Sequence, residues 1–210
     1  MYCPECHVTR PHSHMYCFHC GTLLKGDHQD EHLWAVVDFV NRAQCEASFN
    51  EIEKFANQHP ENSYAQKILG NALFHKGRLT EAESRYRSAL DIEPNNIDLM
   101  YDLSIALYYQ ARLTEAMNSL KTVLNMDPEY SAAHYRLGLI YYHLGQHEEA
   151  AEHLQKCTTL TPDFVMSHYH LGVVYSKMGK VEEAIQEFDQ QLDRNLSDAA
   201  CRRHLEELFA

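Results

Sequence analysis

Positive charge is scarce in this sequence. Lys and Arg number 18 against 30 Asp and Glu, which gives a formal net charge of −12. A protein that binds nucleic acid needs a basic surface to neutralise phosphates. Because no basic segment stands out, we do not expect nucleic acid to be the main partner.

Long apolar runs are also missing. No stretch approaches the roughly 20 apolar residues that a helix needs to cross a bilayer. The first residues lack the basic and apolar segments of a secretory signal. Hydrophobic residues make up 45% of the chain and charged residues 23%, as in ordinary folded soluble proteins. We therefore expect a soluble, cytoplasmic protein without a membrane span.

The sequence has no pattern of paired cysteines that would suggest disulfides. It contains seven cysteines, an odd number, and Cys45, Cys157 and Cys201 are scattered. This usage fits a reducing compartment. No constellation of acids, histidines and nucleophiles typical of a catalytic site is present either, so we do not expect an enzyme.

What the sequence does have is a period of 34 residues. Proline, leucine and alanine recur at this spacing, and glycine does so in part. The aligned sets are Pro60, Pro94, Pro128 and Pro162; Leu69, Leu103, Leu137 and Leu171; Ala82, Ala116, Ala150 and Ala184; and Gly70, Gly138 and Gly172. Together with flanking aromatic residues, this pattern resembles the tetratricopeptide repeat (TPR) family. The resemblance implies two antiparallel helices per repeat.

Local chemistry independently favours helical hairpins. Leu137, Ile140, Tyr141 and Leu144 have the spacing of one helix face. A second glycine, such as Gly145, falls where the chain must turn between helices. The recurrent proline then prevents the helix from continuing into the next repeat.

We predict an all-α TPR solenoid over residues 29–210. The predicted segments are a degenerate unit at 29–62, full repeats at 63–96, 97–130, 131–164 and 165–198, and a C-terminal capping helix at 197–210. The repeat at 97–130 departs from the pattern, with Ser104 and Ala111 where the others have glycine. A terminal helix of this kind covers the last apolar face of a solenoid.

The resemblance also implies a concave groove lined by the first helix of each repeat. In the family, defined positions of that helix point into the groove and bind a protein or peptide segment. The corresponding residues here are Tyr64, Lys67, Asn71, Phe74, Tyr101, Ile105, Tyr108, Tyr109, Tyr135, Leu139, Tyr142, Tyr169 and Val173. Their aromatic rings bury large areas at low entropic cost and favour binding. Tyrosine also occurs at several of these family positions for packing.

One family subtype grips a terminal carboxylate with a clamp of Lys, Asn, Asn, Lys and Arg. Lys67, Asn71 and Arg136 match that clamp, but Asp102 and Ala132 replace its middle Asn and second Lys. A carboxylate at Asp102 would repel the ligand's carboxylate. We therefore expect an extended segment or a helix with apolar anchors in the groove instead.

The N-terminal stretch "CPECHVTRPHSHMYCFHC" predicts a structural metal site. Cys3 and Cys6 form one C-x-x-C pair, and Cys17 and Cys20 form a second pair after ten intervening residues. Four thiolates in two such turns suit a closed tetrahedral Zn(II) site. The stretch resembles the short zinc-ribbon family, and we predict a zinc ribbon at residues 1–28. It is too short to fold on its own core, so the metal would supply folding energy.

Two alternatives remain for this stretch. The letters C-x-x-C-H, ending at His7, also match a haem attachment signature, so haem or iron would make the chain a redox or electron-transfer protein. A zinc ribbon could also serve a nucleic-acid-linked regulator. Neither alternative accounts for the repeats. The sequence therefore favours a non-enzymatic protein-interaction adaptor, whose zinc ribbon caps the solenoid or recruits a second partner.

Overall fold

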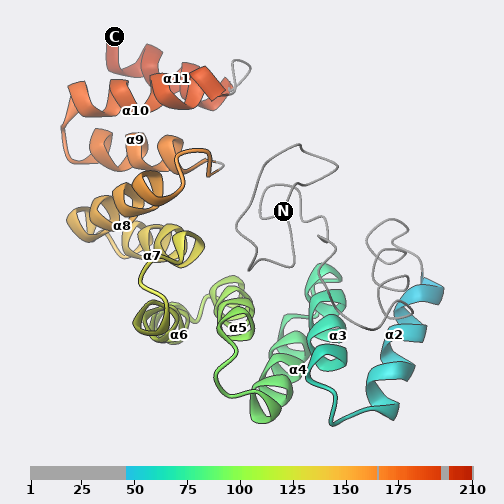
Figure 1. Ribbon diagram of the computed structural model, residues 1–210. Helices are drawn as coiled ribbons and strands as arrows, with labels where there is room; N and C mark the ends of the chain where they lie inside the picture. Colours follow the sequence, from blue (N-terminus) through green and yellow to red (C-terminus); the bar gives the residue numbers. More distant parts are fainter. Residues whose placement is uncertain (1–45, 165, 195–198, 210) are drawn as a thin grey trace. The chain divides into compact units, whose positions relative to one another are not determined.

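The computed structural model describes residues 46–164, 166–194 and 199–209 (Figure 1). These residues fold into ten α-helices and include no strand. They divide into two compact units, one ending at Arg112 and the other beginning at Leu113. The prediction of an all-α repeat of helical hairpins is confirmed for this part of the chain.

The first unit contains four helices. Helices α2 (Glu46–Gln58), α3 (Ser63–His75), α4 (Leu79–Ile92) and α5 (Ile97–Tyr109) follow one another through short turns. Each packs against the next, and the α3–α4 hairpin has the most extensive contact. Buried Gln66 joins three of them, because its amide donates to the Ala56 carbonyl at 2.8 Å and accepts from Arg85 at 3.1 Å.

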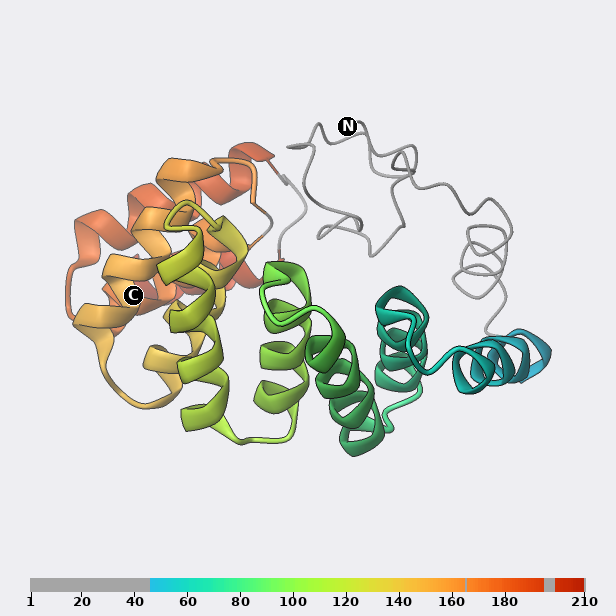
Figure 2. The ribbon, with the colours of Figure 1, turned by 60° about the horizontal axis from the view of Figure 1, so that its bottom comes forward.

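The second unit contains six helices. They are α6 (Leu113–Met126), α7 (Ser131–His143), α8 (His147–Leu160), α9 (Ser167–Lys177), α10 (Val181–Arg194) and α11 (Ala199–Phe209). The α7–α8 and α9–α10 hairpins stack on each other, and α11 packs on α10 and α9 (Figure 1, Figure 2). Cys201 of α11 is buried with Ala184 and Phe188 of α10, and Leu205 and Leu208 pack beside them. The terminal helix therefore covers apolar surface of the last hairpin.

The turns between the two helices of a hairpin use a left-handed backbone. Gly77, Gly145 and Gly179 have φ of 75°, 74° and 74°, and a Cβ added at any of them would meet no atom within 4 Å. Ala111 occupies the aligned position in the remaining repeat and adopts φ of 59°. This conformation is costly for a residue with a Cβ. The turn geometry is therefore kept even where the glycine is lost.

A second glycine lets the two helices of a hairpin approach closely. A Cβ added at Gly138 would lie 2.6 Å from Leu154 Cγ, and one added at Gly172 would lie 2.8 Å from Phe188 Cε1. Small residues at these positions are therefore required by packing. Ser104 takes this place in α5, where it is fully buried and its hydroxyl donates to the Tyr101 carbonyl at 2.6 Å.

The residues that precede the first helix of each hairpin differ between the units. In the first unit, Asn62 and Asn96 cap α3 and α5, accepting from the Ala65 and Leu99 amides at 2.9 and 3.1 Å. At the aligned positions of the second unit, Tyr130 and Phe164 are buried instead. The same slot serves hydrogen bonding in one unit and packing in the other.

Membrane insertion finds no candidate among the described helices. None of them is both long enough and apolar enough to span a bilayer. The predicted zinc ribbon at 1–28 and the first part of the predicted unit at 29–62 lie outside the described residues.

Candidate functional site

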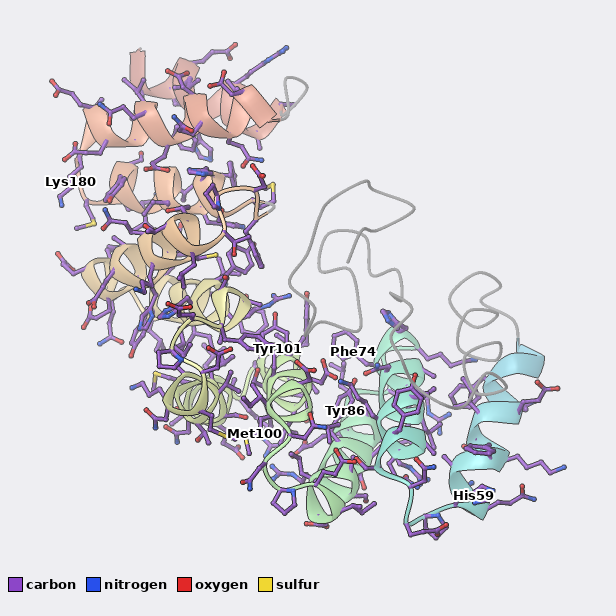
Figure 3. The ribbon with its side chains drawn as sticks, in the orientation of Figure 1. His59, Phe74, Tyr86, Met100, Tyr101 and Lys180 are labelled. Atoms are coloured by element: carbon purple, nitrogen blue, oxygen red, sulfur yellow. The ribbon has the colours of Figure 1, made fainter. Side chains whose placement is uncertain are left out.

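The predicted groove residues lie on the first helix of each hairpin. Helices α3 and α5 carry those of the first unit, and α7 and α9 carry those of the second. We call these two surfaces the first-unit face and the second-unit face. Figure 3 labels Phe74 of α3 and Tyr101 of α5, which belong to the first-unit face.

A buried ion pair joins the two helices of the first-unit face. Lys67 Nζ lies 3.2 Å from Asp102 Oδ2, and the lysine is 5% exposed. Burial acts to lower the pKa of Lys67, but attraction by Asp102 and then Asp98 outweighs it, and the lysine pKa is raised. Burial raises the pKa of Asp102 against the opposing attraction of Lys67. The groove lysine is thus committed to a carboxylate within its own unit.

Aromatic rings cluster at the C-terminal ends of α3 and α5. Phe74 and Tyr109 meet edge to face with ring centroids 5.4 Å apart, and Tyr108 meets Tyr109 at the same distance. Tyr109 is 55% exposed, which is high for a large side chain. Rings held in this way are suited to apolar contact with a ligand.

The other predicted residues of the first-unit face are less open. Asn71 Oδ1 accepts a hydrogen bond at 2.7 Å from the hydroxyl of Tyr86, a residue of α4 labelled in Figure 3. Its side-chain oxygen is therefore used within the hairpin. Tyr64, Tyr101 and Ile105 are half-buried.

On the second-unit face, tyrosines and histidines form a continuous series of ring contacts. Tyr135 lies 4.9 Å from Phe164 and 5.7 Å from His170, measured between ring centroids. Tyr169 lies 5.0 Å from His170, and its hydroxyl is 3.3 Å from His204 Nε2. The predicted tyrosines 135 and 169 are therefore brought together through His170.

One contact recurs along both faces. A residue on the first helix of a hairpin meets the residue 35 positions later on the next helix of the same face or on α11. The pairs are Lys67 with Asp102, Tyr135 with His170, and Tyr169 with His204. The same position thus holds an ion pair in the first unit and Tyr–His contacts in the second.

Several predicted groove residues of the second unit also contribute to packing. Tyr135 and Tyr142 lie against the buried cluster shared by α8 and α9, while Tyr169 and Val173 lie against the cluster of α10 and α11. Leu139 is 8% exposed. Truncating these side chains would therefore disturb the hairpins themselves, a fact that shapes the experiments proposed below.

The sequence interpretation missed a pair of histidine contacts inside the hairpins. His134 Nδ1 lies 3.0 Å from His153 Nδ1, and His134 Nε2 lies 3.0 Å from the Pro128 carbonyl. Since a carbonyl can only accept, His134 carries its proton on Nε2, and neutral His153 then donates from Nδ1. Burial is the main cause that lowers the pKa of both rings, and that of His153 falls to about 4.

The next hairpin repeats this arrangement with a carboxylate. His168 Nε2 lies 3.2 Å from the Pro162 carbonyl, and His168 Nδ1 lies 2.6 Å from Glu187 Oε2. His168 and Glu187 each follow their counterparts by 34 residues. This shared spacing is the signal that could have revealed both pairs.

The described residues offer little to a metal or a nucleophile. Outside the N-terminal stretch, the described chain has no group of three or more His, Cys, Asp or Glu residues placed to hold a metal ion. Cys157 and Cys201 are buried thiols, and burial raises the pKa of Cys157 to about 12. The predicted ligands Cys3, Cys6, Cys17 and Cys20 lie outside the described residues, so the zinc site stays a prediction.

Solved structures with the same fold cover most of this chain. MamA from Desulfovibrio magneticus RS-1 is 22% identical with a TM-score of 0.70, and the alignment covers 84% of this chain and 99% of MamA. YrrB, described as a TPR protein with an unusual peptide-binding site, is 20% identical with a TM-score of 0.64, covering 85% of this chain and 94% of YrrB. PilF from Pseudomonas aeruginosa is 20% identical with a TM-score of 0.73, covering 82% and 78% of the two chains. No curated protein sequence matches the chain.

Family models agree with the fold. A tetratricopeptide repeat model matches residues 37–97 and 101–163, and two further models of the same repeat match residues 73–125 and 153–186. The matched regions overlap both units and the helices that carry the two faces. The chain therefore belongs to the tetratricopeptide repeat family.

Proposed function

We propose that this chain is a non-enzymatic adaptor that binds a segment of another protein on the faces formed by the first helix of each hairpin. The observation that carries the proposal is the series of half-buried tyrosines on the second-unit face. Tyr135 and Tyr169 are held in place by contacts with His170 and His204, yet they belong to the surface rather than to the fully buried core. Fixed aromatic side chains bind a ligand with little further loss of entropy.

The relatives support this proposal at the level of fold. YrrB, which shares the TPR fold, has a peptide-binding site. On this chain the exposed ring of Tyr109 and its neighbours give the first-unit face an apolar anchor point as well.

Site-specific photocrosslinking in the full-length protein tests the proposal. A photoreactive phenylalanine analogue replaces Tyr109 on the first-unit face and, in a second variant, Ser176 on the second-unit face. The controls carry the same group at Ile92 and Val181, which are 40% and 41% exposed and lie on second helices of the hairpins. We expect discrete protein crosslinks from Tyr109 or Ser176 and weak or none from the controls. Equal crosslinking from all four positions would refute a binding role for the faces.

We further propose that Cys3, Cys6, Cys17 and Cys20 hold one structural Zn(II) ion. The support is the donor set, since four thiolates in two C-x-x-C turns leave no open coordination position. Metal analysis of the purified protein should find one zinc per chain and no visible absorbance. Cys17→Ser should release the zinc, whereas Cys201→Ser should not. A coloured protein that contains haem or iron would support the redox alternative instead.

A further inference from the structure

The acidic chain places its charges unevenly over the second unit. Between Val181 and Arg194, helix α10 carries five acidic residues and one basic residue, and α8 carries three glutamates and one lysine. Helices α7 and α9 contain no Asp or Glu at all. The second-unit face is therefore free of negative side chains from its own two helices, although the protein has a net charge of −12.

Cationic side chains gather on that face at matching positions. Arg136 and His143 are seven residues apart on α7, and His170 and Lys177 are seven residues apart on α9. Residues at this spacing lie on the same side of a helix. Helices α7 and α9 are in contact, so the four side chains form a two-by-two cationic patch beside the tyrosines.

The electrostatics of His170 reflect this patch. Burial is the main cause that lowers the pKa of His170 to about 4, and the positive charges of Arg136 and then His143 lower it further. Arg136 also lies 5.7 Å from the ring centroid of Tyr135, so cation and aromatic ring are presented together. The positive potential would be relieved by an anionic group of a ligand.

The first-unit face lacks this property. Asp102 occupies the position of α5 that Arg136 and His170 occupy on α7 and α9, and it binds Lys67 at 3.2 Å. The aligned position thus changes from a carboxylate that neutralises a groove lysine to two cationic side chains. The two faces therefore differ in the sign of the charge that they present.

We propose that the second-unit face selects a segment of a partner protein that is rich in Asp and Glu and carries apolar or aromatic anchors. The carboxylates would lie against Arg136 and Lys177, and the anchors against Tyr135, Tyr142 and Tyr169. This inference rests on the proposed function of the faces and adds the chemical class of the ligand. Complementary charge would also steer such a segment toward a protein that repels acidic chains elsewhere.

Selection from a random peptide library on the full-length protein tests this inference. We expect the selected 12-residue peptides to be enriched in Asp and Glu. Their affinity, measured by fluorescence anisotropy of labelled peptide, should fall by about tenfold in Arg136→Glu plus Lys177→Glu, because attraction at two positions becomes repulsion. A rise in salt from 0.05 to 0.5 M, which shortens the screening length from about 14 to about 4 Å, should weaken binding in the same direction.

The chain offers a matched control with the same change in net charge. Lys156→Glu plus Lys180→Glu reverses two exposed lysines of the same unit that lie outside the second-unit face. We expect this control to change affinity by less than about twofold. Equal losses in both double variants would show a general charge effect and overturn the inference.

Other outcomes distinguish this inference from the proposed function. Neutral or basic peptides that lose binding in Ser176→Trp, which adds bulk to the face, would leave the function standing and overturn the acidic class. Selected peptides that are indifferent to Ser176→Trp would reject the face itself. Comparable binding of a single-stranded oligonucleotide, or self-association abolished by the Arg136→Glu plus Lys177→Glu change, would assign the patch to a different occupant.

Discussion

The two histidine pairs allow a direct test of acid sensitivity within one unit. In the folded chain, the ring of His153 faces the ring of His134, and the pKa of His153 falls from 6.5 to about 4. Its folded-state pKa is lower than its unfolded-state pKa, so the folded state resists protonation. The neutral pair should therefore be fully compatible with folding above about pH 6.5, and stability should be lost progressively as the pH falls toward 4.

The size of the effect follows from that shift. With pKa values of 6.5 unfolded and about 4 folded, the free energy of unfolding drops by about 2 kcal/mol between pH 7.5 and pH 5. Partial solvent exposure of the His153 ring reduces this to about 1–2 kcal/mol. For a chain of this size, the drop corresponds to a decrease of about 3–6 °C in Tm.

Three variants isolate the pair in thermal and urea unfolding measured at both pH values. His153→Gln removes the titrating ring, and we expect its stability to fall less than that of the original chain on going to pH 5. His153→Glu copies the His168–Glu187 pair of the next hairpin, whose atoms lie 2.6 Å apart, and should likewise resist acid. The reciprocal Glu187→His should make the next hairpin more acid-sensitive. Parallel pH curves for the original chain and His153→Gln would refute this reasoning.

Three further predictions concern stability and can be measured by urea unfolding. Ala111→Gly should stabilise the protein by about 0.5–1 kcal/mol, because relief of the left-handed strain exceeds the entropic cost of glycine, whereas Gly145→Ala should destabilise it; a loss in Ala111→Gly would contradict this. Gly138→Ala should cost about 1–3 kcal/mol, because its Cβ would press on Leu154 and lie 3.2 Å from the Ala150 carbonyl; an unchanged midpoint would show that the hairpin can spread. Lys67→Met should cost about 3–5 kcal/mol by leaving Asp102 buried without its cation, and adding Asp102→Leu should recover most of the loss; an equal or greater loss in the double variant would argue against this pair.

The helical hairpins could be predicted from the sequence because their determinants are local and periodic. Leu137 and Leu171, the glycines at close approaches and the alanines of the second helices recur at one spacing, and each is fully or almost fully buried where the structure describes it. A repeated requirement for small or apolar side chains is visible without coordinates. The division of the chain between Arg112 and Leu113 was not predicted. It falls in the repeat whose glycines are replaced by Ser104 and Ala111, a departure that the sequence did show.

The side-chain chemistry of the faces was harder to predict. The position rules of the family placed Tyr135 and Tyr169 on the right helices, but they did not show that these rings pack against the cores of neighbouring hairpins. They also treated Lys67 as a ligand contact, whereas its charge is used by Asp102. Such partnerships depend on residues 35 positions apart meeting in space, and a pattern read within one repeat does not contain that information.

The contact between residues 35 positions apart has a consequence for how this protein could have evolved. Loss of one whole repeat from the second unit would present His204 to Tyr135 in place of His170, so a Tyr–His contact would be restored at the new junction. Repeats of this unit can therefore be gained or lost with the junction chemistry intact. The first unit has no such freedom, because among the first helices that the structure describes an acid stands at the pairing position only in Asp102. The number of repeats is thus more open to evolutionary change in the second unit than in the first.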